Sequence, residues 1–261
     1  AALARRKVTV ALCGEGGDEA FGGYSWYRSW LQFQQPSFWK TPAGQFTGKT
    51  LETLFGWRKK KWRCAGLESV ELYAQLMGAV AAEDKQRIFS AELAEHLRDR
   101  DNAAYFRQFW RDDLPPIARM QYVDLCTFLP DLNLTRADRT SMRVSLELRV
   151  PLLHHRLVEY AVGLPQDVRN PGGELKRLFK QAMSDRLPEA IRTRKKKGFS
   201  APVKQWFTPS DLASLIADVR REHPDLARAW LTADLESHIP VLKGSRGYKL
   251  WVFLQWLRKH G

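Results

Sequence analysis

The sequence lacks the features that mark several protein classes. It contains no apolar run long enough to cross a bilayer, so we expect a soluble protein with no membrane partner. It contains no internal repeat and no low-complexity tract, which excludes a repeat protein. Residues 1–7 hold three basic side chains, and no apolar segment of signal-peptide length follows them, so we expect no secretory signal.

Cysteine is scarce as well. The three cysteines, Cys13, Cys64 and Cys126, are odd in number, far apart in the chain and without CxxC spacing. This pattern argues against a disulfide framework and against a zinc site. We therefore expect a reducing compartment and a cytoplasmic protein.

What is present is typical of a globular protein. The 261 residues are 44% hydrophobic and 11% aromatic, enough for one sizeable core or two modest ones. The formal net charge of +13 is compatible with nucleic acid, a membrane surface or an anionic small ligand as a partner. It is also compatible with solvated surface arginines, and we favour that interpretation over nucleic acid.

The rest of the chain is organised around the stretch VTVALCGEGGDEAFGGY, residues 8–24. Its apolar start, Val8 to Leu12, predicts a buried strand that enters a tight turn at glycine. Glu15, Asp18 and Glu19 suit the first turn of a helix, and free backbone N–H groups at such a junction favour an anionic ligand. Carboxylates there can hold magnesium or take a proton, although an ordinary strand-to-helix turn is the alternative.

A strand buried on both faces needs neighbouring strands and covering helices. Few later segments have strand character, so we expect the chain to be a piece of a longer protein with strands missing upstream. Helices are expected at residues 24–38, 68–80, 84–89, 102–110, 117–128, 157–164 and 173–187, in a helix capped at Ser90, and in the apolar tail. The helix at 117–128 is expected to end at Leu129-Pro130.

Two charged blocks stand out. Residues 132–165 place Arg136, Asp138, Arg139, Arg143, Glu147 and Arg149 among apolar positions. Charges so interleaved are not expected to all face water, so some should pair with each other or meet a charged ligand, and for Arg149 we favour an ion pair. Basic runs at 58–63 and 192–197 are each consistent with phosphate binding or with a solvated loop, and taken alone the solvated loop is favoured.

Together and in this order, three motifs resemble the synthetase domain of the glutamine-hydrolysing asparagine synthetases. An SGEGxDExFGGY stretch of that family matches Cys13 to Tyr24, with cysteine in place of the usual serine. An LPDxL stretch followed by DRxSMxxSLExRVPxLD matches Leu129 to Leu153. An LPxxIxxRxKxGFxxPxxxW stretch matches Leu187 to Trp206.

The resemblance implies an α/β fold of the Rossmann-like pyrophosphatase-loop type, similar to the adenine nucleotide alpha hydrolases. Residues 1–261 would be its mostly helical C-terminal part, with few strands. The family is a carbon–nitrogen ligase that uses ATP and magnesium to adenylate the side-chain carboxylate of aspartate. Ammonia from glutamine, released by an N-terminal glutaminase domain, then attacks the β-aspartyl-AMP. The oligomeric state stays open, with a homodimer among the options.

The same resemblance implies roles for single residues of the first motif. Cys13, Gly14 and Gly16 would line the substrate and nucleotide pocket. Glu15 would lie beside the acyl-adenylate and orient or deprotonate ammonia. Asp18 would help to hold magnesium on the pyrophosphate.

The later motifs would supply the cations of the site. Arg139 and Lys196 would neutralise phosphate charge as the adenylate forms and breaks. Glu147 would bind less directly, behind the residues that touch the substrate. In this context the run Lys195 to Lys197 is better interpreted as a catalytic loop than as a solvated one.

The sequence departs from the family in three respects. The SGGxDS pyrophosphate loop is absent from these residues, so we expect the piece alone to be inactive. His154 stands where the family has aspartate, and Cys13 replaces serine. The changes at Cys13 and His154 leave open a relative that amidates or cyclises another carboxylate through an acyl-adenylate. The net charge of +13 and the basic run 58–63 leave a nucleic-acid-binding module as a second alternative, and a degenerate homologue used as a scaffold is a third.

Overall fold

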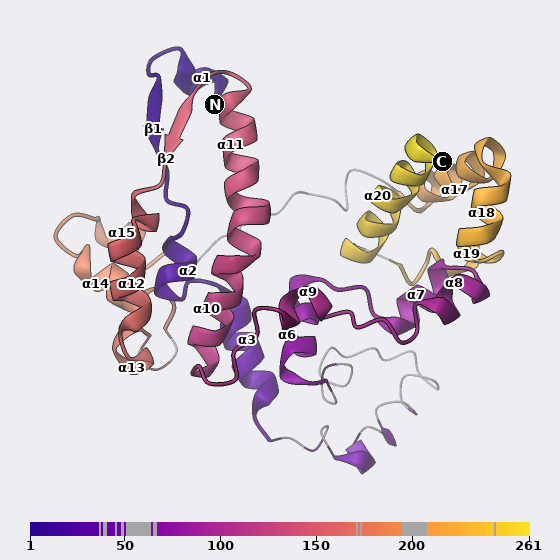
Figure 1. Ribbon diagram of the computed structural model, residues 1–261, viewed down its shortest axis with the longest axis horizontal. Coiled ribbons are helices and arrows are strands. Elements are labelled where there is room, and N and C mark those ends of the chain that lie inside the picture. The colour runs from indigo at the N-terminus through magenta and orange to yellow at the C-terminus, as the bar shows by residue number, and fades with distance from the viewer. Residues whose placement is uncertain are drawn as a thin grey trace. The chain divides into compact units, whose positions relative to one another are not determined.

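The computed structural model describes residues 1–36, 38, 41–44, 46–47, 50, 64, 67–170, 172, 174–194, 208–242 and 244–261 (Figure 1). The chain divides into two compact units, which are treated separately below. Unit 1 comprises Ala1–Met77 and Ala103–Lys195, and unit 2 comprises Gly78–Asn102 and Lys196–Gly261. Among the described residues, no helix is both long and apolar enough to cross a membrane.

Unit 1 contains a small parallel sheet. Strand β1, Val10–Leu12, pairs with strand β2, Glu147–Arg149, so that Val10 faces Glu147 and Leu12 faces Arg149. Over the described ranges these are the two strands of the fold, and the remaining elements are helices. A mostly helical chain with a parallel strand pair is consistent with an α/β synthetase domain.

The expectation of a fully buried first strand was wrong. Val8 is 45% exposed and Leu12 is 72% exposed. The reason is that β1 has a single neighbouring strand among the described residues, so one of its edges is not paired within them. The apolar composition of the segment predicted the strand but not its surroundings.

The helices of unit 1 follow the expected order with shifted ends. In chain order they are α1 (Ala2–Arg5), α2 (Gly17–Phe21), α3 (Ser25–Gln34), α6 (Ser69–Met77), α9 (Ala104–Arg107), α10 (Pro116–Cys126), the π-helix η2 (Leu129–Leu134), α11 (Thr135–Met142), the 3-10 helix η3 (Pro151–Leu153), α12 (His155–Gly163), α13 (Gln166–Arg169), α14 (Arg177–Ala182) and α15 (Glu189–Arg192). The helix expected from residue 173 begins only at Arg177, since Lys176 before it has a left-handed backbone.

The predicted helix end before Leu129-Pro130 is confirmed to within two residues, since α10 ends at Cys126 and Thr127 leaves the helical conformation. The sequence did not predict that η2 begins at Leu129 and leads into α11, and Figure 1 shows α10 and α11 as one nearly continuous column. Pro130 lies in the first turn of η2, where a missing backbone N–H removes no hydrogen bond. This column places Asn133 and Arg136 on the same long element as the core residues of α10.

An aromatic core holds α3, α6 and α10 together. Its buried members are Tyr24, Tyr27, Trp30, Cys64, Leu72, Tyr73, Ile117, Met120 and Val123. The aromatic residues at 105–110 were expected to belong to the core. Phe106, Phe109 and Trp110 do pack against this cluster, whereas Tyr105 is 45% exposed. Burial of such large apolar side chains is the main stabilising contribution that the unit can obtain.

The charged block at residues 136–149 also differs from the expectation. Arg136, Asp138, Arg139, Arg143, Glu147 and Arg149 are all exposed, although the sequence suggested that some must be buried. Other positions of the segment explain this result, because the uncharged residues Ser141 and Leu146 take the inward positions. The ion pair expected for Arg149 is present, with its Nε 2.7 Å from Glu147 Oε1.

Unit 2 has its own helical core. It comprises α7 (Ala82–Ile88), α8 (Ala91–His96), α17 (Pro209–Glu222), α18 (Pro224–Trp230), α19 (Leu235–His238) and α20 (Ser245–His260). Leu250, Leu254 and Leu257 of α20 are buried against α17, so the predicted apolar tail helix is confirmed. The predicted cap is also confirmed, since Ser90 accepts a hydrogen bond from the Leu93 N–H at 3.2 Å.

Candidate active site

The glycine-rich loop leaves the end of β1 and enters α2 within a few residues. The Cys13 N–H donates to the Arg149 carbonyl at 2.9 Å and so extends the pairing of the sheet into the loop. Gly16 has a φ of +88°, and a Cβ atom there would lie 2.1 Å from Leu153 Cδ2. Glycine is therefore required at position 16, both for the left-handed backbone and for the close approach of η3.

The loop and the start of α2 carry three carboxylates, and their environments differ. Glu15 and Asp18 are partly exposed, with side chains 30% and 23% accessible. Glu19 is buried and accepts hydrogen bonds from Tyr24 Oη at 2.5 Å and from Asn133 Nδ2 at 3.4 Å. Burial raises the pKa of Glu19 above its ordinary value, which opposes the effect of the Tyr24 hydrogen bond. Glu19 is thus part of the core, and Glu15 and Asp18 are the carboxylates available to a ligand.

Glu15 meets a cation from the long helical column. Arg136 Nη2 lies 3.6 Å from Glu15 Oε1 and donates to Asn133 Oδ1 at 3.2 Å. The Arg136 side chain is 56% exposed, so this pair is accessible to solvent. Arg136 was noted in the sequence only as one of several interleaved charges, and no local pattern pairs it with Glu15.

Asp18 meets a lysine that the sequence analysis did not select. Lys176 Nζ lies 3.1 Å from Asp18 Oδ1, and its side chain is 26% exposed. Lys176 has a φ of +54°, a strained conformation for a residue with a side chain. The strained backbone is not visible in the sequence, because lysine carries no preference for the left-handed region.

The remaining predicted residues are distributed as follows. Gly14 is exposed and Cys13 is half-buried. Arg139 lies in the last turn of α11, exposed, three residues beyond Arg136 and without an ion pair among the described residues. Glu147 pairs with Val10 at the opposite end of the strand from the loop. Lys196 and the basic run 58–63 lie outside the described residues.

A second buried acid lies in the aromatic core of unit 1. Asp124 of α10 accepts hydrogen bonds from Tyr27, Tyr73 and Trp26. Burial raises the pKa of Asp124 to about 7 despite these donors. The sequence gave no signal for this group, because a single aspartate in a helix usually lies on the exposed face.

The described residues of the loop can hold magnesium only if a substrate supplies further ligands to the ion. Among the described residues, no group of three or more His, Cys, Asp or Glu side chains converges on one point. Magnesium is commonly held by one or two carboxylates together with phosphate oxygens and water. Asp18 is accessible and can offer such an oxygen, so the residues present fit a metal carried largely by the phosphates of a nucleotide.

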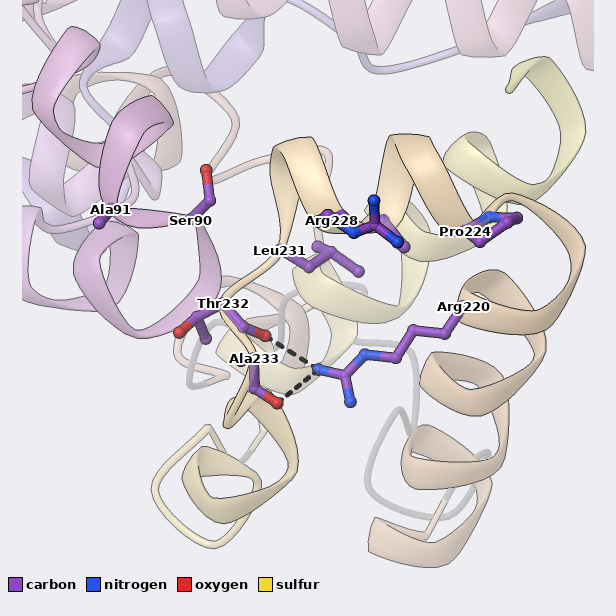
Figure 2. A pocket seen from close by; sticks show the side chains of 9 residues that line it. Ser90, Ala91, Arg220, Pro224, Arg228, Leu231, Thr232 and Ala233 are labelled. Carbon is purple, nitrogen blue, oxygen red and sulfur yellow. Dashed lines mark hydrogen bonds between the residues drawn. The ribbon is translucent and has the colours of Figure 1, made fainter.

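Unit 2 contains a cavity of about 580 Å³ near Ser90, Arg220 and Arg228 (Figure 2). Arg220, which lines this cavity, forms three hydrogen bonds. Its guanidinium contacts Glu236 at 2.7 Å and the carbonyl oxygens of Thr232 and Ala233 at 2.9 Å each. These contacts join α17 to the segment before α19, so the arginine has a structural role and we assign no ligand to this cavity.

Comparison with known proteins decides the family. A model described as asparagine synthase matches residues 1–258. The chain belongs to the asparagine synthase family. No solved structure matches the chain significantly.

Three relatives in two organisms are asparagine synthetases by name. "Asparagine synthetase [glutamine-hydrolyzing] 1" of Bacillus subtilis (strain 168) is 28% identical over 97% of this chain and 41% of its own length. "Asparagine synthetase [glutamine-hydrolyzing] 3" of the same organism is 28% identical over 74% of this chain and 26% of its own length. The Gallus gallus asparagine synthetase is 41% identical over 29% of this chain and 15% of its own length. The chain therefore spans less than half the length of these relatives.

Proposed function

We propose that this chain is the C-terminal part of a synthetase domain that forms an amide through an acyl-adenylate. A carboxylate oxygen of the substrate attacks the α-phosphorus of ATP, the bond from this phosphorus to the oxygen that bridges to the β-phosphate breaks, and pyrophosphate leaves with that oxygen. Ammonia then attacks the acyl carbon, loses a proton, and displaces AMP. The observation that supports this proposal is the convergence of Glu15, Arg136, Asp18 and Lys176 at the glycine loop of a chain of this family.

Glu15 is the proposed base. An attacking amine carries protons that it must lose, and a carboxylate held beside the acyl carbon accepts one. Arg136 lies 3.6 Å from Glu15 and holds this carboxylate in place. Arg136 in turn is held by Asn133, so the pair is fixed to the buried core of α10 and η2.

Lys176, Arg139 and Lys196 are the proposed phosphate cations. Adenylation spreads negative charge over several phosphate oxygens, and cations already in place stabilise that charge without moving. Lys176 adds to the cations expected from the sequence, because its ammonium is already located at the entrance to α2. Magnesium bound at Asp18 would supply further positive charge on the pyrophosphate, and Asp18 would hold it.

The proposed substrates are small molecules: an aspartate-like carboxylate, ATP, and ammonia delivered by a glutaminase domain. Two departures from the family motif lie next to the loop. Cys13 directly precedes Gly14, and His154 follows Leu153, the residue that packs on Gly16. We therefore leave the acceptor open to another carboxylate, amidated or cyclised by the same chemistry. Glu147 is the weakest of the proposed ligands, because it stands at the far end of β2.

We also propose that residues 1–261 alone do not form the adenylate. No SGGxDS string occurs in these residues, and this string is the expected cradle for the pyrophosphate. The neighbouring parts of the natural protein would have to supply it.

The test uses the full-length natural protein with ammonium as the nitrogen donor. Glu15→Ala and Lys196→Ala should each abolish amide formation and leave glutaminase activity unchanged. Glu159→Ala, an exposed glutamate of α12, is the matched control and should retain both activities. Full ammonia-dependent synthesis in Glu15→Ala or Lys196→Ala would contradict the assigned roles.

A further inference from the structure

Helix α2 carries Asp18 and is too short to be rigid alone. It has five residues, and the last carbonyl groups of any helix lack partners within it. Gln121 of α10 supplies two of these partners, donating from Nε2 to the Glu19 carbonyl at 2.6 Å and to the Ala20 carbonyl at 3.2 Å. The buried guanidinium of Arg169 holds Gln121 in turn, at 2.6 Å from Oε1.

Asn170 completes the end of α2 and also reaches a second segment. Its Nδ2 donates to the Phe21 carbonyl at 3.1 Å and approaches the Gly22 carbonyl at 3.5 Å. The same nitrogen donates to the Glu174 carbonyl at 2.9 Å. Asn170 is only 4% exposed, so water competes little for these bonds. One amide group thus joins the end of α2 to the turn at Glu174.

These two segments carry the two partners of the Asp18–Lys176 ion pair. Asp18 lies on α2, a few residues before the carbonyls that Asn170 binds, and Lys176 follows Glu174 by two residues. Lys176 is held in the left-handed region, which a residue with a side chain leaves unless its surroundings fix it. The hydrogen bond from Asn170 to the Glu174 carbonyl is such a restraint, and it acts two residues before Lys176.

The fit of Asn170 is tight, and its side-chain oxygen is buried without a partner among the described residues. Gly22 has a φ of +65°, and a Cβ there would lie 2.5 Å from Asn170 Oδ1. The Asn170 Oδ1 atom has no hydrogen-bond partner among the described residues, and an unpaired buried oxygen is unfavourable. Burial of Oδ1 is therefore unfavourable, while Nδ2 of the same side chain connects the two segments.

We propose that Asn170 is a positioning residue that sets the separation of Asp18 and Lys176, and through them the binding of the ATP phosphates. This inference rests on the proposed function. Asn170 does not touch the substrate in this account. It acts through Lys176 by holding the turn before it, and through Asp18 by holding the end of α2.

A double-mutant cycle in the full-length natural protein tests the proposal. The variants are Asn170→Ala, Lys176→Met and the combination, and the measurement is kcat/KM for ATP in ammonia-dependent synthesis. Asn170→Ala should lower kcat/KM for ATP about tenfold, a change of ~1.4 kcal/mol. Residues that act through one another are not additive, so the loss in the combined variant should be clearly smaller than the sum of the two single losses. Additive losses, or no loss in Asn170→Ala, would overturn the proposal.

A control separates positioning from stability. Thr127→Val removes another buried hydrogen bond of unit 1, from Thr127 Oγ1 to the Val123 carbonyl at 2.7 Å. It should lower Tm without changing kcat/KM for ATP, whereas Asn170→Ala should lower kcat/KM. An equal effect of both variants on kcat/KM would contradict the positioning role.

If Asn170→Ala does not fold, as judged by loss of its cooperative thermal unfolding transition, then Asn170→Ser is measured by the same criterion. The proposed function itself is tested by the unmodified protein. If that protein releases no pyrophosphate from ATP, then the proposed function fails. If it does release pyrophosphate and the cycle is additive, then only the inference about Asn170 fails.

Discussion

Arg136 lies 3.6 Å from Glu15, although 120 residues of chain separate a loop at the end of β1 from a helix next to η2. Arg136 is also bonded to Asn133, whose amide donates to the buried Glu19 and to Tyr24. The exposed pair at the loop is therefore connected to the buried core by one asparagine. This connection explains how a carboxylate on a glycine-rich loop keeps a defined orientation.

The first prediction concerns that orientation. Arg136→Met should lower the rate of ammonia-dependent synthesis about 100-fold, because a catalytic group displaced by ~1 Å loses rate on that scale. Pyrophosphate exchange into ATP should fall much less, since it does not require the base. Arg143→Met, an exposed arginine just beyond α11, is the control and should keep both rates. Equal loss of both activities in Arg136→Met would contradict a role limited to Glu15.

A second prediction concerns the backbone of the loop. Gly16→Ala should lower the free energy of unfolding by about 1–3 kcal/mol, because it combines a positive φ with a collision against Leu153. Gly163→Ala is the matched control, since a Cβ there meets no atom within 4 Å. It should be neutral or raise the stability by up to about 1 kcal/mol. Urea denaturation of both variants provides the measurement, and equal stability of the two would contradict the geometry at Gly16.

The third prediction is a pH dependence. The pKa of Asp124 is raised from the ordinary 3.8 to about 7, so the folded chain binds this proton more tightly than the unfolded chain. Its contribution to stability is therefore most favourable below pH 4 and is lost as the pH rises from about 4 to about 7. Asp124→Asn should flatten this part of the stability curve.

Urea denaturation at several pH values between 4 and 8 measures the effect. Asp138→Asn, at an exposed position of α11, is the control and should leave the slope as it is. A slope that is unchanged in Asp124→Asn would show that the buried carboxyl does not titrate in this range.

A fourth prediction concerns unit 2. Ser90 caps α8 through the Leu93 N–H and donates to the Ala229 carbonyl at 2.7 Å, joining α8 to α18. Ser90→Ala should lower the stability of unit 2 by about 1–2 kcal/mol. Ser214→Ala, at an exposed position inside α17, should change it by less than about 0.5 kcal/mol. Differential scanning calorimetry compares the two, and similar melting would argue against the cap.

Local patterns predicted local structure well. The Ser90 cap, the tail helix and the aromatic core all follow from residue spacing, because spacing determines which side chains share a helix face. Glycines with carboxylates beside them predicted the strand–loop–helix junction at residues 10–21. Pro130 indicated where α10 ends, but not that a new helical segment begins there with the proline in its first turn.

The arrangement of the site was much less accessible from the sequence. Lys176 and Asp18 meet only because the fold closes, and no periodicity links them. The exposure of β1 and of the charged block 136–149 likewise depends on which segments lie beside them, which composition does not encode. The motif resemblance selected Glu15 and Asp18, but only the structure identified their cationic partners.

Transfer of an isotope label tests the central claim most directly. The full-length protein is supplied with ATP, ammonium and aspartate labelled with ¹⁸O in its side-chain carboxylate. In the proposed mechanism the carboxylate oxygen attacks the α-phosphorus and leaves with AMP, which predicts one ¹⁸O atom in each AMP and none in pyrophosphate. Label in orthophosphate together with ADP as the product would show an acyl phosphate and would contradict the account.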